Sequence, residues 1–502
     1  MTAWLLLLGG ALGLRLLFFG GLLGWDDVEY AEAARRLLAG EAAPRSMFDM
    51  RYGVTLPLAA TQALLGPGER AAALVPLAYS MLELGLGGAL GALLGGRAVG
   101  LVTAGLLAVL PLAVVAATDV HADLPAAVFM ALTMYAVLRA DTAGRRRAAW
   151  LAGAGVALGL AYVTKEVALV LALVLAVRVV VLRRPRAGYA WLAAGFLAVV
   201  LLDLGASLWR AGDPLVRHAA AFAAPHVRHV RASPASSAWM LAYPAMLLVP
   251  SSGYFGYFAG VSYLALAGVA WGLRVGARAV GELVAWWLPV LLVFNFAPLD
   301  WTFRHPLFFH FPRTLQPLVI PLAVTAAFGL VRGLGPRPLA RAAVGVAVLA
   351  LAAAGIIRTH ADYRAWAAVA RQAAEVIRRE PADAVVLADR LSVARLQVLL
   401  PERRARIAWW GGQGGLPRAG ASPRLVLADP LRLREDVEAG APAAVRAPPP
   451  AWERVAEFTR PPRASLRGRL GLWLGVGGAE PGAPPAPPAV LWRVRPAPGA
   501  GG

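Results

Sequence analysis

The chain has 502 residues, of which 59% are hydrophobic and only 16% are charged, and it contains no cysteine. Because a soluble domain usually has about 25% charged residues, this composition indicates a protein that is largely dissolved in lipid, and the lack of cysteine excludes disulfides and thiolate metal sites. The net charge of +20 does not indicate nucleic-acid binding, since the arginines form short clusters between apolar runs and no basic stripe carries interleaved aromatic residues.

Apolar runs recur from Trp4 to Ile357, and each is long enough to cross ~30 Å of hydrocarbon. The first run has neither a basic leader nor a cleavage site, so we interpret it as a transmembrane helix and not as a signal peptide. The sequence therefore predicts about eleven transmembrane helices, at residues 3–23, 71–95, 98–117, 124–139, 149–164, 166–182, 189–209, 254–273, 283–297, 314–331 and 340–357.

The basic clusters fall in every second connection between these runs. Because positive residues accumulate in cytoplasmic loops, this pattern predicts a multi-pass membrane protein with a cytoplasmic N-terminus. The clusters contain Arg97, Arg139, Arg145 to Arg147, Arg183 to Arg186, Arg274, Arg278, Arg332, Arg337 and Arg341. The connections predicted to face outward are 24–70, 118–123, 164–166, 210–253 and 298–313.

The first outward connection carries three acids in a short stretch: Asp26, Asp27 and Glu29. A helical pattern over 27–39 predicts a helix that lies on the membrane surface directly after them. Crowded carboxylates can share a proton, raise one pKa or bind a cation, and one of them suits a general base. The alternative is a solvated helix start, because acids are favoured near helix N-termini.

Two further outward turns carry charge at the membrane boundary. Asp119, His121 and Asp123 share one very short turn, whose alternative explanation is ordinary turn chemistry with Asp123 as a helix cap. Lys165, the only lysine, precedes Glu166 inside an apolar stretch. Charges at this depth usually face a cavity or a partner, so Lys165 suits a phosphate, although a simple Lys–Glu pair at the turn is the alternative.

Arg313 begins a late Pro-rich span at its outer mouth. The planar guanidinium suits a phosphate oxyanion, and interfacial snorkelling is the alternative. The histidines of the 210–253 connection have no zinc-binding spacing and favour surface or substrate contacts over a metal site. Glu83 and Asp203 lie deeper in their spans and have no assigned role.

The chain changes character at about residue 358. A helix is predicted at 362–379, followed by a buried strand at 384–388, a helix at 390–400, a strand at 424–428 and a last strand at 490–494. These elements predict a small extracytoplasmic α/β domain. The predicted organisation is therefore a transmembrane catalytic domain over residues 1–357, an α/β domain over 358–475 and a Pro/Gly-rich tail over 476–502.

In this order, the motifs resemble a known family over roughly residues 1–360. It is the GT-C fold of glycosyltransferases that use polyprenyl-phosphate sugars, in the bacterial branch related to protein O-mannosyltransferases and aminoarabinose lipid A transferases. The resemblance is carried by Asp26 to Arg35, Arg51-Tyr52-Gly53, Asp123-Leu124-Pro125, Thr164-Lys165, Gly212-Asp213-Pro214 and Arg313. Two departures are Asp27, where glutamate is commoner, and Thr55-Leu56, where aminoarabinose transferases carry a lysine before the proline.

The resemblance implies an all-α polytopic GT-C protein that performs an inverting sugar transfer at the outer face. The donor would be a polyprenyl-phosphate sugar, the acceptor a protein, lipid or cell-wall glycan, and no cofactor or divalent metal would be required. It implies catalytic roles for Asp26 and Asp27, with Asp26 as the base. It implies substrate contacts for Glu29, Tyr30, Arg51, Tyr52, Asp119, His121, Asp123, Lys165, Glu166 and Arg313.

Two other functions remain open. One is a ligase or polymerase that joins whole glycans from lipid carriers, for which a large late outer loop would be expected. The other is a transporter or lipid flippase, for which internal repeats would be expected. No convincing repeat is visible in the sequence.

Overall fold

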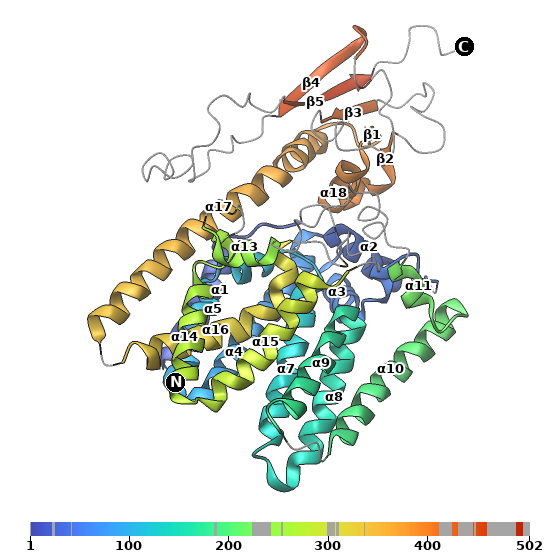
Figure 1. Ribbon diagram of the computed structural model, residues 1–502. Helices are drawn as coiled ribbons and strands as arrows, with labels where there is room; N and C mark the ends of the chain where they lie inside the picture. The colour runs from blue at the N-terminus through green and yellow to red at the C-terminus, as the bar shows by residue number, and fades with distance from the viewer. Residues whose placement is uncertain are drawn as a thin grey trace.

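The computed structural model describes residues 2–22, 26–41, 43–184, 188–222, 242–250, 252, 255–298, 307, 311–335, 337–410, 424–429, 445, 448–458 and 488–494. A bundle of long helices occupies one end of the molecule and a small sheet the other (Figure 1). Short helices α2 and α3 lie across the end of the bundle that faces the sheet. This layered arrangement places α2 and α3 between the bundle and the C-terminal domain.

Every predicted apolar run overlaps a helix. The bundle contains α1 (Thr2–Leu17), α4 (Glu69–Gly95), α5 (Arg97–Val109), α6 (Pro111–Ala116), α7 (Asp123–Ala140), α8 (Arg147–Thr164), α9 (Val170–Val180), α10 (Tyr189–Ala211), α14 (Val261–Val275), α15 (Arg278–Phe296), α16 (Gln316–Phe328) and the first part of α17 (Pro338–Arg379). Within the described parts of the chain, seven helices combine the length and apolar composition that a membrane crossing needs. The predicted number of about eleven spans is therefore not confirmed, although the all-α membrane architecture is.

The helices pack through small residues. A Cβ added to Gly155 of α8 would lie 2.0 Å from the backbone oxygen of Leu192, and one added to Gly195 of α10 would lie 2.2 Å from that of Ala152. Only glycine permits this backbone contact between α8 and α10, as is common between helices in membranes.

Three predicted basic connections meet at one end of the bundle. Arg178 Nε lies 2.8 Å from Glu282 Oε2, and Arg184 Nε lies 2.5 Å from Glu282 Oε1. Arg178 also pairs with Asp141. Arg178, Arg184, Asp141 and Glu282 therefore form one ion-paired group at the end of the bundle away from the sheet (Figure 1).

The helix predicted at 27–39 is confirmed as α2 (Asp26–Leu38). It is followed by a 3-10 turn, η1 (Met47–Met50), and by α3 (Tyr52–Leu65), which the sequence analysis did not predict. Tyr30, Ala34, Val54 and Leu58 form part of a separate buried apolar cluster between these helices. This cluster fixes α2 against the end of the bundle.

The C-terminal domain is a mixed five-stranded sheet with the order β2-β1-β3-β5-β4. The predicted strands are confirmed as β1 (Val385–Ala388), β3 (Arg424–Ala428) and β5 (Ala489–Val494), and the predicted helix as α18 (Arg390–Leu399). Strands β2 (Ile407–Trp409) and β4 (Trp452–Phe458) were not predicted. β1 pairs in parallel with β2 and β3, whereas β5 pairs antiparallel with β3 and β4. Apart from residues 488–494, the predicted tail lies outside the described residues.

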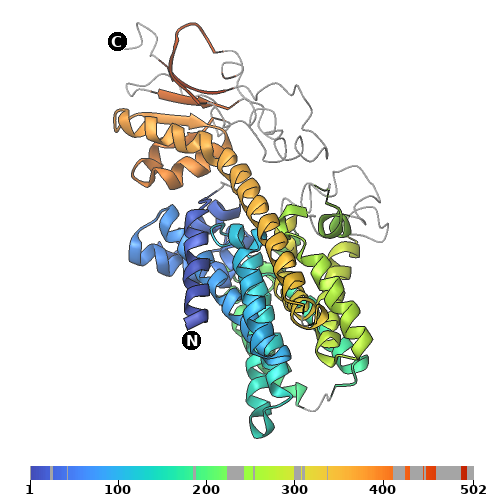
Figure 2. The same ribbon diagram turned by 90° about the vertical axis from the view of Figure 1, so that its left-hand side faces the viewer.

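One helix connects the two ends of the molecule. α17 runs without interruption from Pro338 to Arg379, so the predicted domain boundary at 357/358 falls inside it (Figure 2). Its first part belongs to the bundle, and its last turns pack under the sheet through Val369, Ala373 and Ile377. α17 is thus shared by the bundle and the C-terminal domain.

Candidate active site

The first turn of α2 is joined to a residue from the far end of the bundle sequence. Arg313, in the 3-10 turn η6 (Pro312–Leu315), donates from Nη2 to Asp26 Oδ2 over 2.7 Å. The Asp26 side chain is 35% exposed and that of Arg313 30% exposed. Two residues that are 287 positions apart in the sequence therefore form one ion pair, and both side chains remain partly accessible to solvent.

The turn between α6 and α7 lies beside this pair. The Asp123 backbone N–H lies 3.1 Å from His121 Nδ1, and the same ring nitrogen lies 3.4 Å from Asp123 Oδ2. Lys165 pairs with Asp123 through its ammonium group. Their positions in the sequence predicted that these three residues lie at the same membrane boundary, and the structure brings them into contact.

Asp119 is buried in the same turn. Burial raises the pKa of the Asp119 carboxyl, the nearby His121 and Arg313 act against this shift, and the carboxylates of Asp26 and Asp123 reinforce it. The pKa of Asp119 therefore depends on charges in α2, in η6 and in its own turn. This makes it a second buried carboxyl within the electrostatic reach of the Asp26–Arg313 pair.

Arg51 links α3 to the lysine-bearing turn. Its Nη1 donates to the Tyr30 hydroxyl over 2.8 Å, and its Nη2 lies 3.7 Å from Glu166 Oε2. Burial raises the pKa of the Tyr30 hydroxyl, so Tyr30 is a neutral phenol at physiological pH. Arg51, Tyr30 and Glu166 are all residues that the sequence analysis nominated, and they form one connected group.

Tyr52 borders a group that sequence reasoning missed. The guanidinium groups of Arg210 and Arg217 lie 5.9 and 5.5 Å from its ring centroid, and Arg210 Nη1 donates to its hydroxyl over 3.2 Å. Arg217 also donates from Nε to Asp203 Oδ2 over 2.8 Å and lies 3.6 Å from Glu166 Oε1. The signal available was a charged residue, Asp203, inside an apolar span, which needs a partner.

The acidic stretch does not act as one cluster. Asp27 is 1% exposed, and its Oδ1 accepts the Val28 backbone N–H over 3.0 Å, whereas Asp26 is partly open. No described residue forms an ion pair with Glu29. The pair predicted as catalytic therefore occupies two different environments, one buried and one accessible.

Other titratable residues lie apart from this group. His218 Nε2 lies 2.9 Å from the Tyr162 hydroxyl, while His226, His229, Arg304, His305 and His310 lie outside the described residues. Gln316 Nε2 donates to Glu83 Oε1 over 2.8 Å inside the bundle. In the described ranges, no group of three or more His, Asp or Glu residues has an arrangement that could hold a metal ion.

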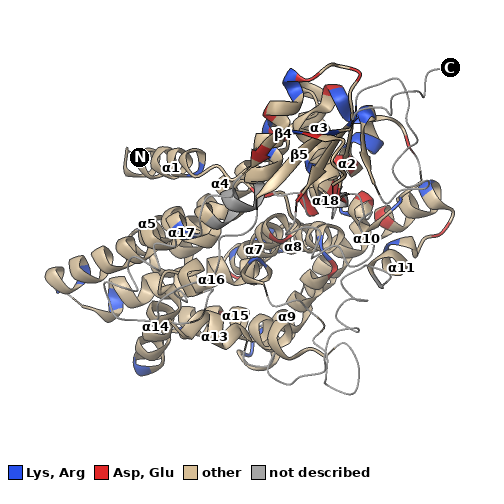
Figure 3. Cartoon of the chain, turned by 90° about the horizontal axis from the view of Figure 1, so that it is seen from above, with Lys and Arg blue, Asp and Glu red and all other residues tan. Residues whose placement is uncertain are grey.

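From above, charged residues gather over α2 and α18, at the end of the bundle that holds the site, whereas α14 and α16 are almost free of charge (Figure 3). The site therefore combines two cations, Arg313 and Lys165, with three acids, Asp26, Asp119 and Asp123. Such an arrangement can bind a phosphate and take up a proton close to it.

The chain is similar to known proteins in part of its sequence and in its fold. The model of the dolichyl-phosphate-mannose-protein mannosyltransferase family matches residues 54–205. ArnT from Cupriavidus metallidurans is similar in structure in its apo state, with a TM-score of 0.61 and 14% identity over 98% of both chains. Its structure bound to undecaprenyl phosphate gives a TM-score of 0.60 and 15% identity over 98% of both chains.

A more distant likeness is the oligosaccharyltransferase from Archaeoglobus fulgidus in its apo form. The TM-score is 0.50 with 11% identity, over 81% of this chain and 64% of that chain. No match was found among curated protein sequences. The chain is therefore a multi-pass membrane protein with the GT-C glycosyltransferase fold.

Proposed function

We propose that the protein transfers a sugar from a polyprenyl-phosphate carrier to an acceptor hydroxyl, on the outer face of the bacterial inner membrane. The observation that carries this proposal is the Asp26–Arg313 pair, in which a carboxylate and a phosphate-binding cation share one partly open site. The family model over residues 54–205 and the likeness to ArnT bound to undecaprenyl phosphate support the same donor class. The N-terminus would be cytoplasmic and the α/β domain extracytoplasmic.

In this proposal the reaction is a single inverting displacement. Asp26 takes the proton of the acceptor hydroxyl, the new bond forms between the acceptor oxygen and C1 of the sugar, and the bond from C1 to the phosphate oxygen breaks. Polyprenyl phosphate leaves with the bonding electrons. General-base help of this kind typically contributes about 10²–10⁴-fold to a rate.

Arg313 and Lys165 stabilise the leaving phosphate. Both cations are paired with carboxylates, Arg313 with Asp26 and Lys165 with Asp123. A donor phosphate placed between them competes with Asp26 for Arg313, which releases the carboxylate to accept a proton. The proposed site therefore couples donor binding to activation of the base. It uses no divalent metal, because two side-chain cations meet the phosphate.

The remaining nominated residues shape the site. Tyr30, Arg51 and Glu166 form the connected group that holds α2 and α3 against the lysine turn. We assign substrate contacts to Asp119 and His121 because they lie in the turn that carries Asp123. Asp27 is a supporting residue in this proposal, since it is buried, and we assign a substrate contact to Glu29.

The test is the substitution Asp26→Asn, with Asp383→Asn as the matched control in an exposed part of the C-terminal domain. Membranes carrying each variant are assayed for consumption of a polyprenyl-phosphate sugar, and envelope glycolipids and glycoproteins are compared by mass spectrometry. We expect Asp26→Asn to lose about 10²–10⁴-fold in transfer while the protein inserts normally, and Asp383→Asn to keep full activity. Near-normal turnover in Asp26→Asn would refute the assignment of the base.

A further inference from the structure

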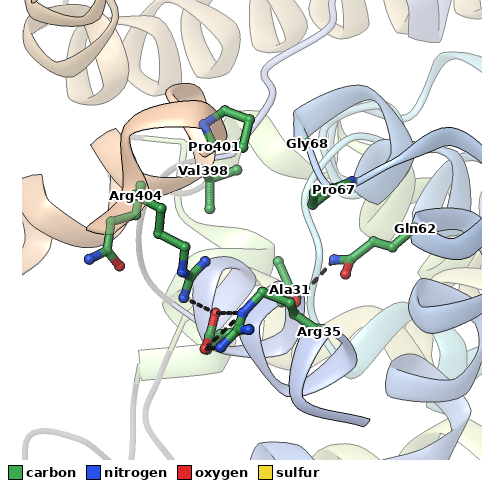
Figure 4. Close-up of a pocket in the computed structure, with 10 residues that line it drawn as sticks. Ala31, Arg35, Gln62, Pro67, Gly68, Val398, Pro401 and Arg404 are labelled. Carbon is green, nitrogen blue, oxygen red and sulfur yellow. Dashed lines mark hydrogen bonds and ion pairs between the residues drawn. The ribbon is translucent and has the colours of Figure 1, made fainter. Parts of the chain in front are cut away.

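The buried and half-buried acids outside the candidate active site differ in how their charge is balanced. Between α2 and the 3-10 turn η8 (Pro401–Arg406), Glu32 pairs with Arg35 and with Arg404, beside a pocket that all three residues line (Figure 4). Glu83 in the middle of α4 forms no ion pair with any described residue, although it is 0% exposed. A charged residue inside a membrane span needs a partner, so this carboxyl needs its own explanation.

The Glu83 carboxyl contacts the amide of Gln316, the first residue of α16. Gln316 Nε2 donates to Glu83 Oε1 over 2.8 Å, and both side chains are fully buried. Within the described parts of the chain, the other oxygen of each group, Glu83 Oε2 and Gln316 Oε1, has no hydrogen-bond partner and less than 1 Å² of accessible surface. Because a water-sized cavity beside either atom would give it accessible surface, the missing donor has to come from the pair itself.

Arg15 of α1 is buried in the same part of the bundle, but its donors bind neutral acceptors. Its Nε donates to the hydroxyl of Ser80, one turn before Glu83, over 2.7 Å, and its two Nη atoms donate to backbone carbonyls of α1 and α5. Arg15 and Glu83 both lie in the described part of the chain, and they form no ion pair. An ionised Glu83 would therefore be a buried charge with a single donor, which is costly.

One proton removes this cost. A protonated carboxyl has an O–H donor, so Glu83 Oε2 can donate to Gln316 Oε1 while Glu83 Oε1 accepts the Gln316 N–H. Both unpaired oxygens are then satisfied within the pair, and no charge is left inside the bundle. We propose that Glu83 is a neutral carboxylic acid and that this acid–amide pair positions Arg313.

The pair lies at the end of the turn that carries Arg313. Gln316 follows η6, and its backbone N–H donates to the Arg313 carbonyl, while its side chain ties the same turn to α4 through Glu83. Arg313 in turn donates to Asp26 over 2.7 Å. Glu83 touches none of the reacting groups and acts through Gln316, so it is a positioning residue. The role of Arg313 in this inference rests on the proposed function.

Exchange variants distinguish a neutral acid from a carboxylate. In Glu83→Gln the new N–H replaces the O–H as the donor to Gln316 Oε1, and the new amide oxygen still accepts the Gln316 N–H. The double variant Glu83→Gln with Gln316→Glu exchanges acid and amide, whereas Glu83→Leu removes both hydrogen bonds. Thr325→Val is the matched control, because it removes a buried hydrogen bond of α16, from Thr325 Oγ1 to the Pro321 carbonyl over 2.6 Å, away from η6.

Infrared difference spectra of the full chain in lipid nanodiscs, wild type minus Glu83→Gln, test the proton. We expect the C=O band of a protonated carboxyl at neutral pH. Thermal unfolding should give Glu83→Gln and the exchange variant a melting temperature near that of the wild type, and Glu83→Leu a lower one, because Gln316 loses its partner. Carboxylate bands in place of the protonated band, or a Glu83→Gln variant that is destabilised as much as Glu83→Leu, would show that Glu83 is ionised and overturn the inference.

Steady-state kinetics with a polyprenyl-phosphate sugar test the positioning. Glu83→Leu should lose about 10–10²-fold in kcat/KM with a raised donor KM, because a small misplacement of a substrate-positioning group has an effect of this size. Glu83→Gln and the exchange variant should keep the wild-type values. Thr325→Val should melt at a lower temperature and keep its donor KM. An unchanged donor KM in Glu83→Leu would mean that the pair only stabilises the fold, and would refute the positioning role.

The two measurements separate this inference from the proposed function. A wild type that transfers no sugar but shows the protonated band would refute the proposed function and keep the acid–amide pair. The position of Arg313 is then measured by calorimetry with undecaprenyl phosphate, whose binding Glu83→Leu should weaken and Thr325→Val should not. A wild type that transfers sugar, with Glu83→Leu kinetically equal to Thr325→Val, would refute the inference and keep the function.

Discussion

Arg313 Nη2 lies 2.7 Å from Asp26 Oδ2, so two candidate site residues from opposite ends of the transmembrane sequence form an ion pair. The pair joins η6 to the first turn of α2 and closes the site across the end of the bundle. Both side chains are partly exposed, so a substrate could reach them and replace the contact between them.

Arg313→Gln should lower transfer by about 10²–10³-fold, because a preorganised cation is lost from the leaving phosphate. The KM for the donor should rise as well, whereas Asp26→Asn should mainly lower kcat. Steady-state kinetics with a polyprenyl-phosphate sugar measure both. Arg332→Gln, an exposed arginine in the π-helical turn that follows α16, is the control and should behave as the wild type. A normal donor KM in Arg313→Gln would contradict the phosphate role.

Asp119→Asn should change how stability depends on pH. Burial raises the pKa of Asp119, so between its ordinary value and this raised value the folded chain keeps a proton that the unfolded chain has lost. Stability therefore falls as pH rises through this window. The neutral amide has no such loss, so Asp119→Asn should unfold at a higher temperature than the wild type at neutral pH and at the same temperature well below pH 4.

Thermal unfolding in detergent over a pH series measures this difference, with Asp383→Asn as the exposed control. A stability difference between Asp119→Asn and the wild type that does not shrink in acid would show that burial of the carboxylate is not its cause.

Gly21→Ala should destabilise the connection between α1 and α2. Gly21 has a φ of +69°, and a Cβ there would lie 2.0 Å from Glu69 Oε1 and 2.1 Å from Arg371 Nη2. The left-handed conformation alone costs an alanine about 1–2 kcal/mol, and the displaced Glu69–Arg371 pair adds to it. Gly10→Ala is the control, since a Cβ there meets nothing within 4 Å and alanine favours a helix. The melting temperature should fall for Gly21→Ala and hold or rise for Gly10→Ala.

Arg217→Met should be strongly destabilising, by about 3–5 kcal/mol, because it leaves Asp203 as a buried charge without its partner. The double variant Arg217→Met with Asp203→Leu should recover much of this loss, since it removes both charges. Urea or thermal unfolding of Arg217→Met, Asp203→Leu and the double variant in detergent, compared with the wild type, forms a double-mutant cycle. Additive effects of the two substitutions would mean that the pair does not act as a unit.

Much of the secondary structure could be predicted from the sequence because it depends on local patterns. Each apolar run overlaps a helix, and α2, α18, β1, β3 and β5 follow from hydrophobic periodicity within a few residues. α3 escaped prediction because Pro57 lies inside it, and proline usually interrupts a helix. The count of spans was not decided, because several apolar helices are short.

The sequence by itself determined which side chains could carry the chemistry, since lone charges in apolar stretches are costly and need partners. Only the tertiary structure decided the partners: Asp26 with Arg313, Lys165 with Asp123, and Arg217 with Asp203. It also separated buried Asp27 from open Asp26 and formed a pocket between Gln62 and the C-terminal domain. These contacts depend on how distant helices pack, which no local pattern of neighbouring residues encodes.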